Sequence, residues 1–259
     1  MPDYDSFEDF VERLQEIEAL GYIETHRAGN TGIGKTLEDL LGIEENNVPS
    51  PDAVGVELKA ARRGSASKMS LFTKEPPRGS RDKWGAASLV NEYGYYDEDN
   101  DRLGLYCTLY VNRYNNQGFK LFPRDDGLYV EHEDDGYLAH YPPDVLREQF
   151  SEKVGEMVLV EADSRTIDDT EHFHYNEAYH LDGFDADEFL KMIEEGVIKV
   201  ELRMHYDEDG SGSRNHGTAF RILDTSELDR AYSNRTQLID GIGRDAGVTA
   251  DPQQGLDDF

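Results

Sequence analysis

The sequence predicts a mixed α/β fold in which helices flank a mixed sheet. The chain has 259 residues, which is long enough for one large domain or two small lobes around a sizeable core. Apolar residues recur at helical spacing in some segments and alternate in others, and the two kinds of segment are mixed along the chain. No internal repeat is visible. Because helices and strands are mixed in this way, we expect the sheet to be mixed as well.

Three segments have the apolar spacing of helices. The segment 6–20 places its apolar side chains on one face, and Ser6 is a candidate N-cap for it. The segment 36–43 is shorter and carries three leucines on one face. The segment 185–196 also directs its apolar residues to one side. Each of the three segments has a glycine at or next to its end, which is typical of a helix C-terminus.

Strands are expected where apolar and polar residues alternate over short runs. Residues 197–205 alternate clearly, and 216–222 are the expected partner strand. Residues 207–213 are then a mobile turn, and residues 241–259 are predicted to be a disordered acidic tail. Further strands are predicted at 53–60, 103–111, 119–122, 127–131 and 156–161.

The chain is strongly acidic. Fifty-five Asp and Glu face 26 Lys and Arg, so the formal net charge is −29. Taken alone, this charge argues against nucleic acid as a partner, because phosphates would be repelled. The aromatic content of 10% and the apolar periodicity speak against general disorder. We therefore interpret the charge as a halophilic composition, in which an acidic surface stays hydrated and its self-repulsion is screened by salt.

Cysteine usage and hydropathy indicate a cytoplasmic protein. The single cysteine, Cys107, excludes an internal disulfide and suits a reducing compartment. The N-terminus has neither a basic region nor an apolar region of the signal-peptide kind. No stretch approaches the roughly 18 uninterrupted apolar residues that a membrane span needs, so no membrane association is expected.

Basic residues concentrate in one stretch, which we call the basic island: Lys59–Lys83, "KAARRGSASKMSLFTKEPPRGSRDK". It holds eight Lys or Arg and only two acids, Glu75 and Asp82. A solvated loop is the simpler interpretation of such a run. In an acidic chain, however, a local excess of cations favours a surface that faces phosphates.

The segment Gly29–Thr36, "GNTGIGKT", matches the P-loop pattern, in which Lys35 and Thr36 would serve a nucleotide and Asp163 a magnesium ion. The pattern requires a buried strand before the loop and a long helix after it. The preceding "YIETHRA" is polar, and the helix after Thr36 is short. We therefore favour a glycine-rich turn that leads into a short helix. A third interpretation is that its backbone amides meet a DNA phosphate.

The segment "PDAVGVELKAAR", residues 51–62, carries the candidate chemistry. Side chains at i and i+2 of a strand share a face, so Glu57 and Lys59 point one way while Val56, Leu58 and Ala60 point into the core. Asp52 precedes the strand and can reach the same point. Two carboxylates on one magnesium ion, with a lysine beside the attacking water, suit hydrolysis of a phosphodiester. A surface salt bridge is the alternative explanation.

Several ordered motifs together resemble one family. They are "TGIGKTLEDLLGI", which contains Glu38, "PDAVGVELKAAR", "SLFTKEPP", "YNEAY" at 175–179 and "RNHGTAFRI" at 214–222. From about residue 20 to 230, the chain resembles the MvaI/BcnI group of type II restriction endonucleases, with the mismatch-repair nickase MutH as a more distant relative. The resemblance implies a PD-(D/E)xK nuclease core with Mg²⁺, plus a DNA-recognition lobe, in a single domain over 1–240. The catalytic lobe is expected at roughly 1–120 and the recognition lobe at roughly 121–240, with interleaving allowed.

The resemblance also assigns residues. It implies that Asp52 and Glu57 bind the metal, that Lys59 positions the water and that Glu38 assists. It puts His216 and Arg221 forward as base contacts, and bidentate arginine–guanine pairing makes the second choice sensible physically. Arg203 and Arg214 are weaker candidates for base contacts. In the basic island, the expected DNA-binding residues are Arg62, Arg63, Lys68, Arg78 and Arg81.

The remaining expectations concern the substrate and partners. The resemblance suggests double-stranded DNA with a short GC-rich site of the CC-N-GG kind, a companion DNA methyltransferase that forms no stable complex, and action as a monomer. Three alternatives stay open: a MutH-like repair nickase, a P-loop NTPase and an acidic protein that mimics DNA. A zinc site among His172, His174 and His180 is a less favoured interpretation of the histidine-rich segment 171–181.

Overall fold

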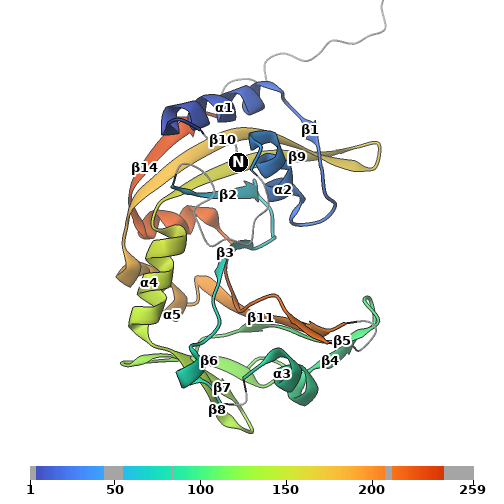
Figure 1. Cartoon of the computed structure of the whole chain (residues 1–259), viewed down its shortest axis with the longest axis vertical. Coiled ribbons are helices and arrows are strands. Elements are labelled where there is room, and N and C mark those ends of the chain that lie inside the picture. The colour runs from blue at the N-terminus through green and yellow to red at the C-terminus, as the bar shows by residue number, and fades with distance from the viewer. Residues whose placement is uncertain (1–3, 44–54, 83, 208–211, 242–259) are drawn as a thin grey trace, which may run out of the picture.

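The computed structural model describes residues 4–43, 55–82, 84–207 and 212–241, and its strands form three sheets. Figure 1 shows the first sheet with two helices in the upper part of the molecule and the second sheet in the lower part. The predicted mixed α/β class is confirmed, because one strand pair of the first sheet is parallel and the others are antiparallel. In the described residues, no helix is long and apolar enough to cross a membrane.

The first sheet has the strand order β1-β10-β9-β2, and β14 also pairs with β10. Its strands are β1 (Ile23–Glu24), β2 (Glu57–Arg62), β9 (Met157–Ile167), β10 (Thr170–Phe184) and β14 (Tyr232–Ile239). Helices α1 (Phe7–Ala19) and α2 (Gly32–Leu41) pack on one face through a core that includes Phe10, Leu37, Val158 and Phe173. β2, which carries Glu57 and Lys59, is thus an edge strand whose Leu58 packs, with the preceding Val56, in the core beneath these helices.

The second sheet has the order β3-β13-β11-β5-β4, with β12 pairing with β11. Its strands are β3 (Met69–Thr73), β4 (Tyr95–Asp97), β5 (Arg102–Leu109), β11 (Ile198–Tyr206), β12 (Ser213–Asn215) and β13 (Ala219–Ile222). Helix α3 (Ala86–Tyr93) covers one face, where Leu89 and Val90 are buried with Leu105 and Leu202. The opposite face, which we call the polar face of the second sheet, carries Tyr106 and Thr108 of β5 and Glu201, Arg203 and His205 of β11.

A third, smaller sheet and two further helices complete the fold. The sheet consists of β6 (Phe119–Arg124), β7 (Gly127–His132) and β8 (Gly136–Tyr141). Helices α4 (Pro143–Val154) and α5 (Ala186–Glu194) contact each other, and their apolar faces belong to the same core as the second sheet. Two short 3-10 helices, η1 (Arg78–Ser80) and η2 (Thr225–Arg230), precede α3 and β14.

The two larger sheets each take strands from both ends of the chain. β2 lies between α2 and β3 in sequence, but β2 belongs to the first sheet and β3 to the second. Later, β9 and β10 return to the first sheet before β11 and β13 return to the second. A catalytic lobe built on the first sheet and a recognition lobe built on the second would therefore interleave along the chain.

Several sequence predictions are confirmed. The Ser6 hydroxyl accepts a hydrogen bond from the Asp9 amide at 3.1 Å, as an N-cap does, and Gly21 at φ 72° follows the helix. The strands 197–205 and 216–222 were expected to pair, and β11 and β13 do pair, antiparallel. The second helix differs from the prediction: it begins at Gly32 rather than 36. The predicted tail at 241–259 lies, apart from Gly241, outside the described residues.

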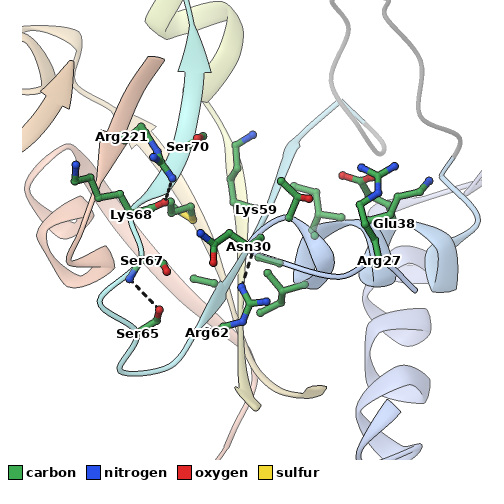
Figure 2. Close-up of a pocket in the computed structure, with 18 residues that line it drawn as sticks. Arg27, Asn30, Glu38, Lys59, Arg62, Ser65, Ser67, Lys68, Ser70 and Arg221 are labelled. Atoms are coloured by element: carbon green, nitrogen blue, oxygen red, sulfur yellow. Dashed lines mark hydrogen bonds between the residues drawn. The ribbon is translucent and has the colours of Figure 1, made fainter. Parts of the chain in front are cut away.

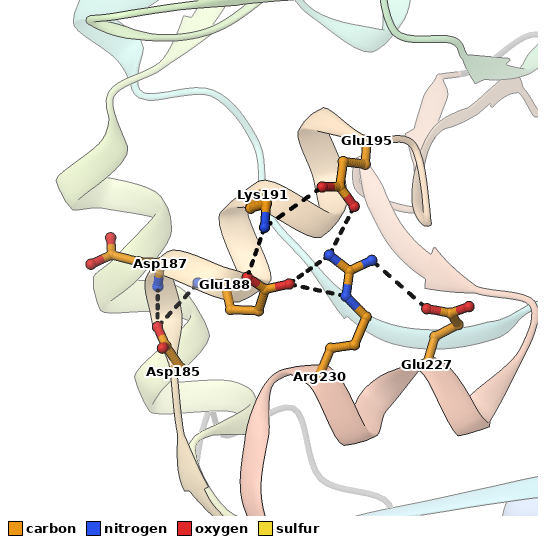
Figure 3. Close-up of polar contacts among 7 residues, drawn as sticks. All are labelled: Asp185, Asp187, Glu188, Lys191, Glu195, Glu227 and Arg230. Atoms are coloured by element: carbon orange, nitrogen blue, oxygen red, sulfur yellow. Dashed lines mark hydrogen bonds and ion pairs between the residues drawn. The ribbon is translucent and has the colours of Figure 1, made fainter.

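The surface between α5 and η2 carries an ion network, shown in Figure 3. Arg230 contacts three carboxylates: Glu188 at 2.5 Å, Glu195 at 2.8 Å and Glu227 at 3.8 Å. Lys191 also lies near two of them, at 3.4 Å from Glu188 and 3.8 Å from Glu195. We call this set of residues, together with Asp185 and Asp187, the α5–η2 network. It joins the two helices while leaving more carboxylates than cations.

Candidate active site

Strand β2 presents the predicted carboxylate and lysine side by side. Val56 and Leu58 are buried at 3% and 6% exposure, so the side chains between and after them point to the other face. On that face, the Lys59 ammonium donates to a Glu57 carboxylate oxygen at 2.5 Å. The parallel pairing with β9 sets Glu57 opposite Met157 and Lys59 opposite Leu159. The pair is thus held on a regular strand at the edge of the first sheet.

A cavity of about 330 Å³ opens between α2, β2 and β3 (Figure 2). Glu38 of α2 and Lys59 of β2 both line it, so two of the predicted catalytic residues from separate elements share one cavity. The start of helix α2 packs closely on the loop that precedes it, because a Cβ at Gly32 would lie 2.1 Å from the Arg27 carbonyl oxygen. The predicted metal ligand Asp52 lies outside the described residues.

The residues present fit a hard divalent cation in part. Carboxylate oxygens are the donors that Mg²⁺ prefers, and Glu57 offers one beside Lys59 with 12% of its side chain exposed. Within the described ranges, no group of three or more His, Cys, Asp or Glu could hold a metal ion. The zinc interpretation of the histidine-rich segment is therefore wrong for these residues. His174 contacts the Glu18 carbonyl at 3.1 Å, whereas His180 contacts Glu156 at 2.8 Å.

The opposite wall of the cavity carries two predicted DNA-binding residues, Lys68 and Arg221. Both contact the same carboxylate, Glu201, and Arg221 does so at 2.9 Å. Burial alone would raise the pKa of Glu201, but hydrogen bonds from Lys68 and Arg221 bring its pKa below the ordinary value. The Nε of Arg221 is buried without a hydrogen-bond partner in the described structure. Two cations thus share one ionised acid at the cavity wall.

Arg62 and Arg63 bind protein groups on opposite sides of β2. Arg62 lines the cavity and donates twice to Glu171, both at 2.7 Å, and to the carbonyls of Gly29 and Asn30 at 3.0 and 3.1 Å. It therefore supports the glycine-rich loop. Arg63 instead contacts Asp163, Asn176 and Glu177, so it ties β2 to the "YNEAY" segment of β10.

The P-loop interpretation does not agree with the geometry. Helix α2 begins inside the motif, and only the two-residue edge strand β1 precedes it. The Thr36 hydroxyl is buried and accepts from the His26 amide at 2.9 Å. The Lys35 ammonium pairs with Asp39 at 2.8 Å, and Asp163 pairs with Arg63 at 2.7 Å. The glycine-rich turn that leads into a helix is thus the better description.

The loop that carries His216 is held by a residue that sequence reasoning did not single out, Glu75. One Glu75 oxygen accepts from the Thr218 amide at 2.7 Å and the Thr218 hydroxyl at 2.9 Å. The other accepts from the Trp84 indole at 2.7 Å. Gly217, at φ 84°, provides the turn that a side chain would obstruct against Thr73. An acid inside the basic island was the only sequence signal for this role.

His216 and Arg203 lie by the polar face of the second sheet. The His216 amide donates to the Arg203 carbonyl at 2.9 Å, and the His216 ring lies 5.0 Å from the ring of His205. Burial, followed by the charge of nearby arginines, lowers the pKa of both histidines. Tyr106 joins them, since its hydroxyl is 2.7 Å from His205 Nδ1. The lowered pKa values favour the neutral form of both histidines, which offers one donor and one acceptor nitrogen.

The other predicted DNA-binding residues lie outside this cavity. Arg214, on β12, pairs with Asp207 at 2.7 Å and is 70% exposed. Arg78 lies in η1, and Arg81, just after it, donates to the Pro76 carbonyl. The cavity thus brings together Glu38, Lys59, Arg62, Lys68 and Arg221, whereas Arg63, Arg78, Arg81 and Arg214 do not line it.

The comparisons with known proteins identify the class as restriction endonucleases, enzymes that cut DNA at specific sequences. The sequence model of the MvaI/BcnI restriction endonuclease family matches residues 11–232, which is most of the chain. The chain belongs to the MvaI/BcnI restriction endonuclease family and is a type II site-specific deoxyribonuclease. The resemblance read from the motifs is thereby confirmed.

The solved structures that are similar to this chain include two of the restriction endonuclease MvaI. The first is described as "Restriction endonuclease MvaI-cognate DNA substrate complex"; it is 30% identical, with a TM-score of 0.76, over 92% of this chain and 100% of that one. The second is "Restriction endonuclease MvaI in the absence of DNA", at 29% identity and a TM-score of 0.48, over 88% and 96%. The first confirms the fold class. No curated protein matches the sequence.

Proposed function

We propose that this endonuclease uses Mg²⁺ to hydrolyse phosphodiester bonds of double-stranded DNA at a short GC-rich site of the CC-N-GG kind. The observation that carries the proposal is the shared cavity. Glu38 and Lys59 line it from α2 and β2, and Lys68 and Arg221 line it from the opposite wall. A phosphate that enters there would meet the candidate catalytic groups and two cations together. The MvaI structure with cognate DNA supports double-stranded DNA as the substrate.

In this proposal, Asp52 and Glu57 hold the metal. When bound, Mg²⁺ supplies positive charge at the scissile phosphate. Lys59 positions the attacking water, because its ammonium is fixed by Glu57 at 2.5 Å and still lines the cavity. Glu38 assists from α2, across the same cavity.

The reading of DNA is assigned to the second sheet and its neighbours. Arg221 and His216 contact base edges, with Arg203 and Arg214 as secondary contacts. Neutral imidazoles and an arginine beside an ionised Glu201 supply both donors and acceptors for this purpose. The phosphate contacts are Arg62, Arg63, Lys68, Arg78 and Arg81. The enzyme acts as a monomer, and a separate DNA methyltransferase protects the host sites.

The test uses substitutions in β2 and before it. Asp52→Ala and Glu57→Ala are each expected to abolish cleavage of plasmid DNA in Mg²⁺ while DNA binding stays measurable, because neither removes a positive charge. Lys59→Ala is expected to lower the cleavage rate by several orders of magnitude with folding unchanged. Lys191→Ala, which removes a lysine that is 58% exposed on α5, is the matched control and should cut normally.

The readouts are fragment patterns on gels, binding in Ca²⁺ or without metal, and circular dichroism. Full cleavage by Asp52→Ala or Glu57→Ala would exclude the assigned metal site. A merely twofold loss for Lys59→Ala would give that lysine a structural role. Discrete plasmid fragments that disappear when EDTA is added and return with Mg²⁺ support both the metal and the sequence specificity.

A further inference from the structure

Acid-free stretches of the sequence contribute most of the residues that line the active-site cavity. Asp and Glu make up about one residue in five, and the four longest stretches that lack them are 102–124, 58–74, 210–223 and 25–37, in order of decreasing length. The stretches 25–37 and 58–74 contribute most of the cavity lining, and 210–223 contributes Arg221 and His216. The longest of the four, with 23 residues, has no role in the function described so far.

The stretch 102–124 continues the polar face of the second sheet. It comprises β5, the loop 110–118 and β6. On β5, Tyr106 lies opposite Arg203, and Thr108 lies opposite Glu201. The Thr108 hydroxyl accepts from Lys68 Nζ at 3.2 Å, and Lys68 lines the active-site cavity. The loop after β5 therefore begins directly beside that cavity.

A second cavity, of about 410 Å³, lies between β5 and this loop. Asn115 builds its wall, because its side chain accepts from the amides of Gln117 at 3.0 Å and Phe119 at 2.9 Å and donates to the Thr108 carbonyl at 2.9 Å. The loop is thus fastened to β5. The residues that line the cavity are polar or aromatic and include Tyr106, Thr108, Tyr110, Arg113, Asn116 and Gln117.

Arg113 is an exposed cation on this loop, and its charge is not neutralised. Its guanidinium lies over the Tyr110 ring, 4.2 Å from the centroid, and no carboxylate in the described part of the chain pairs with it. An aromatic ring orients a guanidinium without cancelling its charge. By contrast, the partly exposed Arg147 of α4 pairs with Asp144 and Asp187. A positive group kept free of acids in an acid-rich chain suits a phosphate.

We propose that Arg113 and the loop 110–118 bind backbone phosphates of the duplex outside the recognition sequence. The loop offers a guanidinium, side-chain amides and a tyrosine hydroxyl, which are donors to phosphate oxygens. It offers no carboxylate of the kind that accepts from cytosine. The inference rests on the proposed placement of DNA along the polar face of the second sheet, because only then does the flanking duplex pass the loop.

The test compares two duplexes that share the recognition sequence, once that sequence has been mapped from plasmid fragments. The short duplex extends about two base pairs beyond it on each side, and the long duplex about ten. Arg113→Ala is expected to weaken binding of the long duplex and to flatten its salt slope by roughly one unit, with little change for the short one. Arg113→Lys, which keeps the charge, should retain the slope. Arg147→Ala is the matched control and should change neither duplex.

Three results would overturn the proposal. An equal loss on both duplexes would place Arg113 inside the recognition sequence. A change in the ratio of cleavage between preferred and altered sites would make it a base contact. Binding by Arg113→Ala that equals the parent on the long duplex would remove the loop from the interface. If the parent itself cuts neither duplex in Mg²⁺, the proposed function fails instead.

Discussion

The wall of the active-site cavity and the α5–η2 network have opposite ratios of cations to carboxylates. At the wall, two cations, Lys68 and Arg221, share the single carboxylate of Glu201. In the α5–η2 network, the single Arg230 serves three carboxylates, with Lys191 near two of them (Figure 3). The formal charge of −29 is therefore an average over unlike regions. It says little about whether a particular surface can meet a phosphate.

The difference also explains how an acidic protein can be a DNA enzyme. Acidic surfaces repel the duplex, and cationic cavities attract it, so the two together favour approach from the cavity side. Salt shortens the range of both effects, to a Debye length of about 3 Å at 1 M. We propose that the acidic surface is an adaptation to high salt, where only close contacts such as those of Arg221 keep their strength.

The largest effect is expected when the arginine of each region is removed, Arg221 from the cavity wall and Arg230 from the α5–η2 network. Arg221→Ala should cost about 1–3 kcal/mol of preference for the cognate site, so preferred and altered sites are cut at more nearly equal rates. Arg230→Ala should leave that preference unchanged. The measurement is cleavage of a panel of duplexes with single substitutions at two salt concentrations.

A second variant, Arg78→Ala, distinguishes a phosphate contact from a base contact. Arg78→Ala should slow cleavage of all duplexes in the panel alike and flatten the salt slope by roughly one unit, because a lost phosphate contact carries no sequence information. If Arg221→Ala lowers every duplex by one common factor, that residue holds phosphate or packs, and the bases are read elsewhere.

A smaller effect is expected from Glu75, which acts through the loop rather than on DNA. In Glu75→Gln, an NH₂ group replaces one of the two accepting oxygens. That group faces a donor of either Thr218 or Trp84 and cannot accept from it, so one hydrogen bond is lost. We expect about 1 kcal/mol, or roughly fivefold, less discrimination at the base that His216 is proposed to contact. In a His216→Ala background, Glu75→Gln should reduce discrimination no further. An additional loss in that background would give Glu75 a role independent of His216.

The smallest effect is expected in the α5–η2 network, on the melting temperature of the protein. Arg230→Ala leaves the carboxylates of the α5–η2 network without their central cation, so their repulsion should lower the melting temperature at low salt. At molar salt the repulsion is screened, and the decrease should vanish. Thermal unfolding at the two salt concentrations, followed by circular dichroism, measures it. A decrease of equal size in both would show that Arg230 stabilises by packing rather than by charge.

Much of the fold could be predicted from local pattern. The cap at Ser6, the amphipathic faces of α1 and α5 and the pairing of β11 with β13 all follow from short-range periodicity. The start of α2 did not follow, because Gly32 and Gly34 are poor helix formers. Its first turn is supported by a tertiary contact, in which the buried Tyr175 hydroxyl donates to the Ile33 carbonyl at 2.7 Å. No local pattern contains that contact.

The candidate site could also be predicted only where its residues follow a local pattern. Glu57 and Lys59 share a face because of strand periodicity, which a sequence displays directly. The acids that organise the surroundings were missed, because their partners are remote in sequence. Glu75 meets Thr218 across 143 residues, and Glu171 meets Arg62 across 109. Such pairs come together only through the arrangement of both sheets.

The parallel pairing of β2 with β9 also sets the order in which an active enzyme can form during synthesis. Glu57 lies opposite Met157, so the strand that carries the catalytic pair waits for a neighbour made one hundred residues later. Arg62 must wait longer, for Glu171 on β10. On the ribosome, a chain that has reached only the third sheet holds Glu57 and Lys59 on an unpaired strand. A host that makes this nuclease therefore meets its activity only after β9 and β10 have been translated.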